Sequence, residues 1–335
     1  MGGMFSGPLT WQNAIVWILA SVVLLFLVLG FVTYAIYFER KILGWAQARH
    51  GPNRVGPFGL LQTVADVAKV LMKEDIMPKN ADRALFILAP FLAFVPAFTV
   101  LATIPFTGWA YFADLNVGLL YYVALSSITT LGILLGGWAS NNKYALLGGM
   151  RSAAQMISYE IPLVISVVGV VLLSGSLNMS KIVDGQEGWF WNWNIVPQFL
   201  GFVVFMIAAF AELNRTPFDL PEAESELVAG YFVEYSGFRW AMYMLTEYVY
   251  MFAIAALTTV LFLGGWHAPA PFLEFIPGIV WFLLKFAFVV FFIIWTRATL
   301  PRMRVDQLMG FGWKVLLPLA LANVFLTAVW LEIFN

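Results

Sequence analysis

The chain consists of long apolar runs separated by short polar segments. Eight runs are long enough, or nearly so, to cross a hydrocarbon core of about 30 Å, which requires roughly 20 helical residues. They cover residues 14–38, 85–106, 117–139, 161–175, 195–211, 248–264, 278–296 and 314–331. Lipid offers no partners for free backbone groups, and the weak alternation typical of membrane β-strands is absent from the sequence. The pattern predicts an all-α integral membrane protein with eight transmembrane helices in a single domain over residues 1–335.

The composition agrees with this prediction, because 61% of the residues are hydrophobic and only 11% are charged. More than half of the charged side chains fall in two segments, 39–83 and 212–247. The first apolar run lacks the cationic start and the small-residue cleavage site of a signal peptide, so we expect it to be retained. A membrane protein shows its function where it tolerates charge, and these two segments are therefore the first candidates.

The basic residues are distributed asymmetrically between the predicted loops. All Lys and Arg residues except Lys181 and Lys285 fall in the segments 39–83, 140–158, 212–247 and 297–314. The positive-inside rule places these segments on the cytoplasmic or matrix side and both termini outside. The even number of predicted spans leads to the same arrangement.

The sequence predicts that this chain holds no redox cofactor. It has no cysteine, and its two histidines, His50 and His267, fall in loops on opposite sides of the predicted membrane. Iron–sulfur clusters usually need four thiolates, and a bis-histidine haem needs two facing histidines. The net charge of −1 also argues against a nucleic-acid partner.

The first charged segment predicts a helix that lies in the membrane interface. Residues 51–57 are rich in glycine and proline, and residues 58–73 then show a helical period. Gln62, Asp66, Lys69 and Lys73 form one polar stripe opposite an apolar face. From this pattern alone, an ordinary amphipathic surface helix and a helix that controls substrate access are equally good interpretations.

The second charged segment is acidic, with seven carboxylates against two basic residues over 212–247. Pro217 and Pro221 predict an extended or turn-like start, followed by a helix whose first turn contains Glu222, Glu224 and Glu226. The helix dipole accounts for one or two of these anions. Three carboxylates within five residues repel one another. Because this repulsion brings no structural benefit, it favours a functional role.

Four more carboxylates fall at the ends of predicted spans on the inner side. Glu39 closes the first span, Glu160 opens the fourth, Glu212 closes the fifth and Glu247 opens the sixth. Together with Glu234 and the acidic segment they predict a half-buried acidic path suited to proton relay. The alternative is a set of ordinary solvated charges. Lys285 falls near the middle of the seventh span, and the sequence does not identify its partner.

Four segments carry a resemblance to a known family: 39–44 (ERKILG), 49–59 (RHGPNRVGPFG), 59–69 (GLLQTVADVAK) and 212–227 (ELNRTPFDLPEAESEL), which Glu234 and Tyr235 follow. They resemble a family of membrane subunits of bacterial proton-translocating NADH:quinone oxidoreductase, respiratory complex I, whose mitochondrial counterpart is NADH dehydrogenase subunit 1. The resemblance extends from the first predicted span to the eighth.

The resemblance implies a membrane-arm subunit that helps to form the quinone-access tunnel and couples quinone reduction to proton translocation. The implied partners are the iron–sulfur and quinone-site peripheral subunits, small membrane subunits, antiporter-like subunits, and membrane lipid. Ubiquinone or menaquinone would be the substrate at the interface with the peripheral subunits, and the chain would not be catalytic alone. The implied location is the bacterial inner (plasma) membrane, or the mitochondrial inner membrane for an organellar protein.

The resemblance also implies roles for individual residues. The quinone-binding residues would be Arg40, Asp66, Phe232, Tyr248 and Arg297. The proton path would comprise Glu39, Glu160, Glu212, Glu222, Glu224, Glu226, Glu234 and Glu247. Arg215 would help to hold the acidic loop.

Two alternatives stay open at the level of the sequence. The first is the homologous membrane subunit of an energy-converting hydrogenase or a related dehydrogenase, although the complete first inner segment favours a quinone. The second is a stand-alone proton-coupled transporter, which the absence of an internal repeat disfavours.

Overall fold

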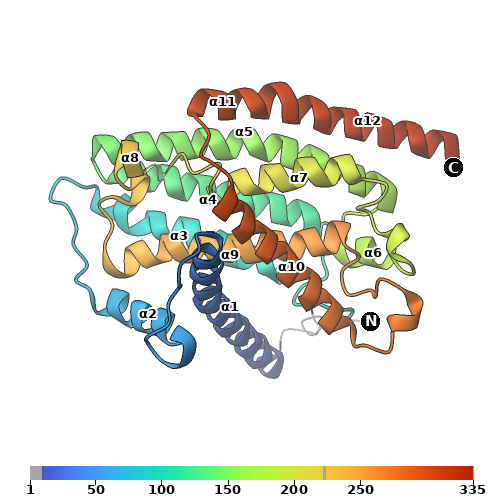
Figure 1. The fold of residues 1–335 in the computed structure, drawn as a ribbon, viewed down its shortest axis with the longest axis horizontal. Coiled ribbons are helices and arrows are strands. Elements are labelled where there is room, and N and C mark those ends of the chain that lie inside the picture. Colours follow the sequence, from blue (N-terminus) through green and yellow to red (C-terminus); the bar gives the residue numbers. More distant parts are fainter. Residues whose placement is uncertain (1–9, 110, 222–223, 335) are drawn as a thin grey trace.

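The computed structural model describes residues 10–109, 111–221 and 224–334, and within these residues the regular structure is helical (Figure 1). The helices are α1 (Trp11–Ala46), α2 (Gln62–Met72), α3 (Arg83–Thr99), α4 (Gly118–Ala139), α5 (Lys143–Ser174), α6 (Met179–Asp184), α7 (Phe199–Glu212), α8 (Glu224–Leu227), α9 (Gly237–Phe262), α10 (Gly278–Thr299), α11 (Val305–Phe311) and α12 (Leu317–Phe334).

Seven helices of the described chain are long and apolar enough to cross a membrane. They are α1, α3, α4, α5, α9, α10 and the combined α11–α12 segment, whose two helices are joined by a π-helical turn, Gly312–Leu316. The fifth expected span, 195–211, corresponds to α7, which is apolar but has only 14 residues. At 1.5 Å per residue α7 is about 21 Å long, shorter than the hydrocarbon core. The chain is a multi-pass membrane protein.

Two expected spans began too late in the sequence. The fourth was expected at 161–175, but α5 is one helix from Lys143 to Ser174. The sixth was expected at 248–264, but α9 begins at Gly237. In both cases a carboxylate that marked the expected helix start lies inside the helix instead. Pro162 is accommodated within α5, as proline often is in membrane helices, and the helix ends at the left-handed Gly175.

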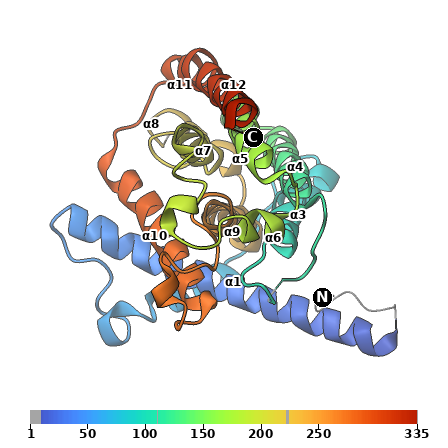
Figure 2. The same ribbon diagram turned by 90° about the vertical axis from the view of Figure 1, so that its right-hand side faces the viewer.

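The central helix of the bundle is α9. Its most apolar window is 83% buried, the highest value among the long helices. Helices α1, α2, α3, α6 and α10 all pack against it, and the end-on view shows it surrounded by the rest of the bundle (Figure 2). A helix buried on all sides can carry polar groups at positions that neither lipid nor solvent reaches.

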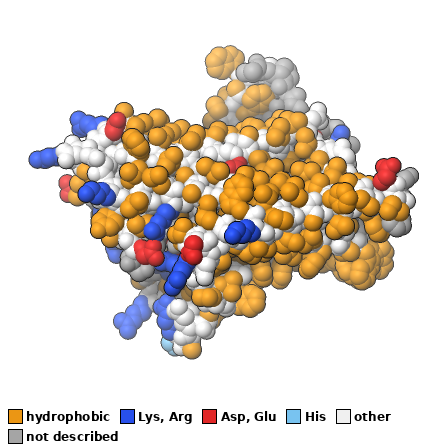
Figure 3. Space-filling view, turned by 90° about the horizontal axis from the view of Figure 1, so that it is seen from above, with side chains coloured by type: hydrophobic (Ala, Val, Ile, Leu, Met, Phe, Trp, Pro, Cys, Tyr) orange, Lys and Arg blue, Asp and Glu red, His pale blue; other side chains and the backbone are white. Residues whose placement is uncertain are grey.

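The outer surface of the bundle is apolar. The α1 window is only 17% buried, so most of its hydrophobic side chains point outward. The space-filling view shows a surface dominated by hydrophobic groups, with most Lys and Arg side chains towards its left end (Figure 3). Exposed apolar area of this extent is typical of a surface that faces lipid or membrane partners.

The two ends of the bundle carry different segments. Helices α2 and α8 lie at the left end, whereas α6 and the C-terminal end of α12 lie at the right end (Figure 1). The two charged segments 39–83 and 212–247 therefore extend to the same end, as expected if both face one side of the membrane.

Candidate functional site

Glu39 of α1 is the centre of a buried ion-pair cluster. Its carboxylate accepts two hydrogen bonds of 2.9 Å from Nη1 of Arg215, one of 2.9 Å from Oη of Tyr248 and another from Nη1 of Arg297. The side chains of Glu39 and Arg215 are each 5% exposed. Burying a carboxylate is costly unless charged partners and hydrogen bonds surround it. Here the partners come from α9, α10 and the segment after α7, so the cluster joins four parts of the chain.

Arg215 connects this cluster to a second carboxylate. Its Nη2 lies 3.7 Å from Oε2 of Glu247, which projects from α9. The guanidinium carbon also lies 4.3 Å from the centre of the Tyr248 ring, in a cation–π arrangement. Arg215 therefore lies between Glu39 and Glu247 and interacts with both.

A buried glutamine holds the segment that carries Arg215. Gln155 of α5 donates from Nε2 to the carbonyl oxygens of Ala211 and Phe218 at 2.7 Å, and to Oδ1 of Asn214 at 3.1 Å. Asn214 has a φ of +51°, in the left-handed region that asparagine tolerates better than most residues. The tight turn after α7 is thus fixed from α5, and it directs Arg215 towards Glu39.

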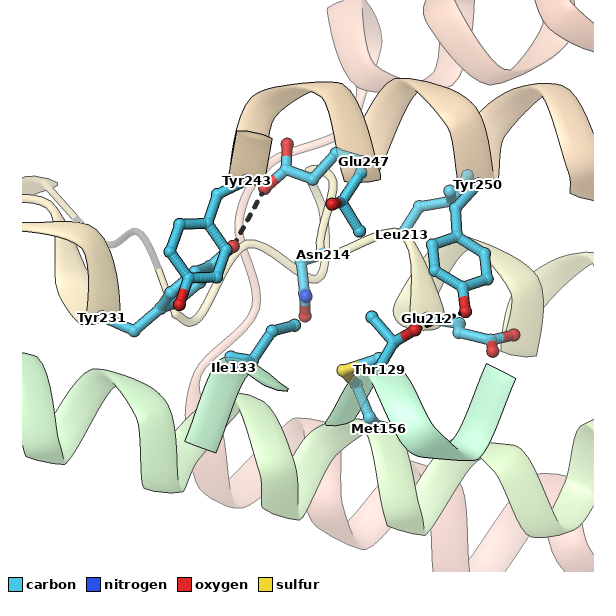
Figure 4. Close-up of a pocket in the computed structure, with 11 residues that line it drawn as sticks. Thr129, Ile133, Met156, Glu212, Leu213, Asn214, Tyr231, Tyr243, Glu247 and Tyr250 are labelled. Atoms are coloured by element: carbon cyan, nitrogen blue, oxygen red, sulfur yellow. Dashed lines mark hydrogen bonds between the residues drawn. The ribbon is translucent and has the colours of Figure 1, made fainter. Parts of the chain in front are cut away.

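A small cavity lies between Glu212 at the end of α7 and Glu247 of α9 (Figure 4). Its volume is about 20 Å³, which is enough for one water molecule. Oη of Tyr231 donates to Oε1 of Glu247 at 3.3 Å on one side of the cavity. On the other side the hydroxyls of Thr129 and Tyr250 are 2.6 Å apart. The two carboxylates therefore line the same cavity, whose lining also includes hydroxyl-bearing side chains and the apolar side chains of Ile133, Met156 and Leu213.

Glu160 of α5 extends this arrangement beyond Glu212. Its carboxylate accepts a hydrogen bond from Oγ of Ser127 on α4, and it is close enough to Glu212 for their charges to interact. The structure thus arranges Glu160, Glu212, Glu247 and Glu39 in one acid row, with the cavity between the second and third members and Arg215 between the third and fourth. Glu39 and Glu212 are buried, whereas Glu160 and Glu247 are partly buried.

The expected positions of these carboxylates at helix ends were largely wrong. Only Glu212 terminates its helix. Glu160 and Glu247 lie within α5 and α9, and α1 continues beyond Glu39 to Ala46. The acid row is therefore more enclosed than a set of helix ends would be, because packed helices rather than the interface surround it.

Other predicted members of the path lie outside the acid row. Glu226 forms a 2.7 Å ion pair with Arg151 and its side chain is 58% exposed. Glu234 accepts a 2.6 Å hydrogen bond from Nδ2 of Asn142, in a surface hollow at the end of the bundle. The last two predicted carboxylates fall outside the described part of the chain: Glu222 and the side chain of Glu224.

Arg40 and Asp66 form an ion pair that connects α1 to α2. Nη1 of Arg40 lies 2.6 Å from Oδ2 of Asp66, and Nε2 of Gln62 donates to Oδ1 at 3.0 Å. Partial burial raises the pKa of Asp66, but the hydrogen bonds from Arg40 and Gln62 and the nearby cations outweigh it and hold the pKa below its usual value. Asp66 therefore joins the predicted polar stripe of α2 to the end of α1.

Phe232 lies in a different aromatic cluster. Its ring packs edge-on against Tyr231 with centroids 4.7 Å apart, and Tyr235 stacks on Phe86 at 4.1 Å in the same buried group. Because Tyr231 also contacts Glu247, Phe232 is connected to the acid row through Tyr231. The five predicted quinone residues thus occupy three places: the Glu39 cluster, the α1–α2 pair and this aromatic group.

The partners of Lys285 are backbone carbonyls rather than an acid. Its Nζ donates to the carbonyl oxygens of Gly265 at 3.0 Å and His267 at 2.7 Å. The ammonium also lies 3.9 Å from the centre of the Trp193 ring. Lys285 therefore reaches the loop that follows α9, at the end of the bundle opposite the Glu39 cluster, and fixes that loop to α10.

Several polar residues of the site were missed from the sequence, including Thr129, Tyr231 and Tyr250 around the cavity. A signal for α4 exists, because residues 126–130 (SSITT) place four hydroxyl groups in the middle of an apolar span. Hydroxyl side chains in a membrane helix usually bond to their own backbone, so this run does not by itself indicate a site.

The chain closely matches known proteins over nearly its whole length. The sequence profile of the NADH dehydrogenase family matches residues 19–328. The H subunit of the NADH-quinone oxidoreductase of Brevibacillus brevis is 69% identical over 320 residues, which cover 96% of this chain and 94% of the relative. The corresponding protein of Bacillus cytotoxicus is 67% identical over 326 residues (97% of each chain), and that of Bacillus thuringiensis is 66% identical over 332 residues (99% and 98%).

Proposed function

Since the chain belongs to the H-subunit family of NADH-quinone oxidoreductase, and is thus a membrane subunit of respiratory complex I, we propose that its Glu39 cluster joins a quinone-access site to a proton path. In this proposal Tyr248 and Arg297 lie on the quinone side of Glu39. Arg215 and the acid row lie on the proton side. Because the chain belongs to this family, we do not pursue the two alternative interpretations of the sequence, a membrane subunit of an energy-converting hydrogenase and a stand-alone proton-coupled transporter.

One observation carries the proposal: Glu39 binds residues of both predicted groups. It accepts hydrogen bonds from Tyr248 and Arg297, and it also pairs with Arg215, which reaches Glu247. A change in charge next to Tyr248 or Arg297 alters the electrostatic balance of Glu39, and Arg215 transmits that change to Glu247. Charges in a poorly hydrated interior interact over several ångströms with little screening, which makes such coupling effective.

The access route in this proposal begins at α1 and α2. The amphipathic α2 exposes apolar side chains while its polar stripe pairs with Arg40, so it lies where a lipid-soluble quinone approaches from the bilayer. Phe232 and the neighbouring aromatic rings then provide an apolar surface close to Glu247. The substrate would be ubiquinone or menaquinone at an interface with the peripheral subunits, in the bacterial inner membrane.

The proton path in this proposal is the acid row together with the cavity. Glu160, Glu212 and Glu247 supply carboxylates, and the hydroxyls of Thr129 and Tyr250 lie beside the gap between the last two. A single water molecule in the cavity would bridge Glu212 and Glu247. Glu226 and Glu234, which lie outside the row, belong to the surface that meets neighbouring subunits.

Tyr248→Phe in the assembled complex tests the connection, because it removes one hydroxyl and leaves the ring beside Arg215. We expect NADH:quinone turnover to fall about tenfold, the kinetic equivalent of a hydrogen bond to a charged group of about 1.5 kcal/mol. NADH oxidation by a hydrophilic acceptor should persist, because that reaction does not use the membrane arm.

The exposed Tyr144 provides the matched control, since Tyr144→Phe removes a hydroxyl at the surface of α5. Equal quinone turnover in the Tyr248→Phe, Tyr144→Phe and wild-type complexes would show that the Glu39 cluster only stabilises the fold.

A further inference from the structure

A basic hollow lies where the chain leaves α1. It has a volume of about 500 Å³, within the range of small-ligand sites, and it is lined by Arg40, Leu43, Arg49, His50, Gly51 and Pro52. The lining contains three basic side chains and, among the described residues, no carboxylate. We propose that this hollow binds the phosphate headgroup of an anionic phospholipid, an inference that does not depend on the proposed function.

The hollow is part of the folded structure rather than a gap in a loose loop. The backbone N–H of Arg49 donates to the carbonyl oxygen of Gly44 at 2.8 Å and turns the chain back onto α1. A Cβ atom on Gly44 would lie 2.9 Å from the backbone of both Arg49 and Gly51, and one on Gly51 would lie 3.0 Å from the Arg40 carbonyl. Glycine at both positions permits this close approach, so the floor of the hollow is fixed before any ligand binds.

The two arginines of the hollow differ in whether they are paired with a carboxylate. Arg40 is paired with Asp66. Arg49 instead donates from Nε to the neutral side-chain oxygen of Gln47 at 2.6 Å, and among the described residues its terminal nitrogens have no hydrogen-bond partner. A guanidinium group without a counter-charge offers two parallel donors, which suit a phosphate. His50, beside it, provides a further nitrogen on the same wall.

The surroundings of the hollow select an amphipathic ligand over a soluble anion. Trp45, on the last turn of α1, is 71% exposed, and the apolar side chains of α1 continue outward from Phe38, which is 53% exposed. Leu61, which directly precedes α2, and Val64 of α2 are exposed as well. An exposed tryptophan at the end of an apolar span marks the headgroup level. A lipid with its phosphate at Arg49 can therefore place its acyl chains along α1.

The test is photo-crosslinking in the purified complex, reconstituted with photoreactive phosphatidylglycerol or with photoreactive phosphatidylcholine of the same chain length. We expect phosphatidylglycerol to label peptides within residues 40–52 and phosphatidylcholine to label them weakly. Arg49→Gln should lower the phosphatidylglycerol label about fivefold, since an interfacial cation contributes about that factor to the binding of an anionic lipid. Arg49→Lys, which keeps the charge, should retain most of the label.

Arg83→Gln is the matched control, because Arg83 is also an exposed basic residue of the same charged segment but lies outside the hollow. Equal labelling by both lipids, or an unchanged label in Arg49→Gln, would overturn the proposal. Co-purification of the variant chain with the activity of NADH oxidation by a hydrophilic acceptor verifies that each variant complex is assembled.

Discussion

The carboxylate of Glu39 on α1 accepts a hydrogen bond from the guanidinium of Arg297 on α10, 258 positions later in the chain. The pair is partly exposed on the arginine side, where the Arg297 side chain is 30% exposed, and buried on the glutamate side. A group that approaches from outside the bundle therefore meets Arg297 first and influences Glu39 through it. This order makes the pair a suitable sensor for charge that appears at the surface of the cluster.

The carboxylates on either side of the cavity should be essential for coupled turnover. Glu212→Gln and Glu247→Gln keep the size and hydrogen bonding of each side chain but remove its ability to exchange a proton. We expect each variant complex to assemble and to lose most of its NADH:quinone activity and proton pumping. The measurements are quinone turnover and pH-gradient formation in vesicles, beside NADH oxidation by a hydrophilic acceptor.

The exposed Glu226 is the control for both variants, because Glu226→Gln breaks only a surface ion pair with Arg151. Such pairs contribute about 0–1 kcal/mol to stability, so this complex should pump normally. If Glu212→Gln and Glu247→Gln both pump protons at the wild-type rate, the acid row has only a structural role.

The Arg40–Asp66 pair should control quinone access rather than electron delivery. Asp66→Asn removes the charge that attaches the polar stripe of α2 to α1, and we expect a higher KM for quinone with little change in the rate with a hydrophilic acceptor. The pair is partly exposed, so its loss should cost about 1 kcal/mol or less of stability. An unchanged KM would make α2 an ordinary amphipathic surface helix.

The same pair should be insensitive to pH over the physiological range. The pKa of Asp66 is lowered in the folded protein, so its contribution is complete above the usual aspartate pKa and is lost only as the pH falls through the lowered value. The KM for quinone should therefore show no titration of this group between about pH 5 and pH 8. A steep change in the wild type in that range that is absent from Asp66→Asn would contradict the assignment.

The two ends of the bundle should be accessible from opposite sides of the membrane. The chain has no cysteine, so Arg54→Cys and Lys181→Cys each introduce a single thiol. We expect a membrane-impermeant maleimide to label position 54 only from the cytoplasmic side and position 181 only from the outside. Labelling of position 54 from the outside would reverse the expected topology.

Lys285 should stabilise the loop after α9 through its charge. Lys285→Met removes two hydrogen bonds from an ammonium group and its contact with Trp193, and we expect a loss of about 2–4 kcal/mol in the free energy of unfolding. Thermal unfolding in detergent measures it, with the exposed Lys181→Met as the control. Equal melting temperatures would show that the carbonyls of Gly265 and His267 find other partners.

Local patterns in the sequence predicted the parts of the structure that depend on neighbouring residues. The four-residue spacing of Gln62 and Asp66 predicted the polar stripe of α2, and in the structure the two side chains are hydrogen-bonded to each other while Asp66 pairs with Arg40. Apolar length located most of the spanning helices. These features follow from the 3.6-residue period of a helix and the thickness of a bilayer.

Features that depend on packing were not predictable in the same way. Glu160 and Glu247 resembled helix starts because a carboxylate inside an apolar helix is costly. That cost is offset here by partners on other helices, such as Ser127 for Glu160, which local sequence does not reveal. The partners of Lys285 were missed for the same reason. They are backbone carbonyl oxygens, which come within hydrogen-bond distance of Nζ only when the loop after α9 is folded.

The size of the cavity between Glu212 and Glu247 has a consequence for selectivity. A space of about 20 Å³ holds one water molecule but not a metal cation together with its hydration shell. A proton needs no such space, because it passes along hydrogen bonds while the oxygen atoms stay in place. If protons follow the proposed path, this gap would therefore act as a size filter. Sodium or potassium would have to shed its hydration shell to pass between these carboxylates, whereas a proton would need only a water molecule in the gap.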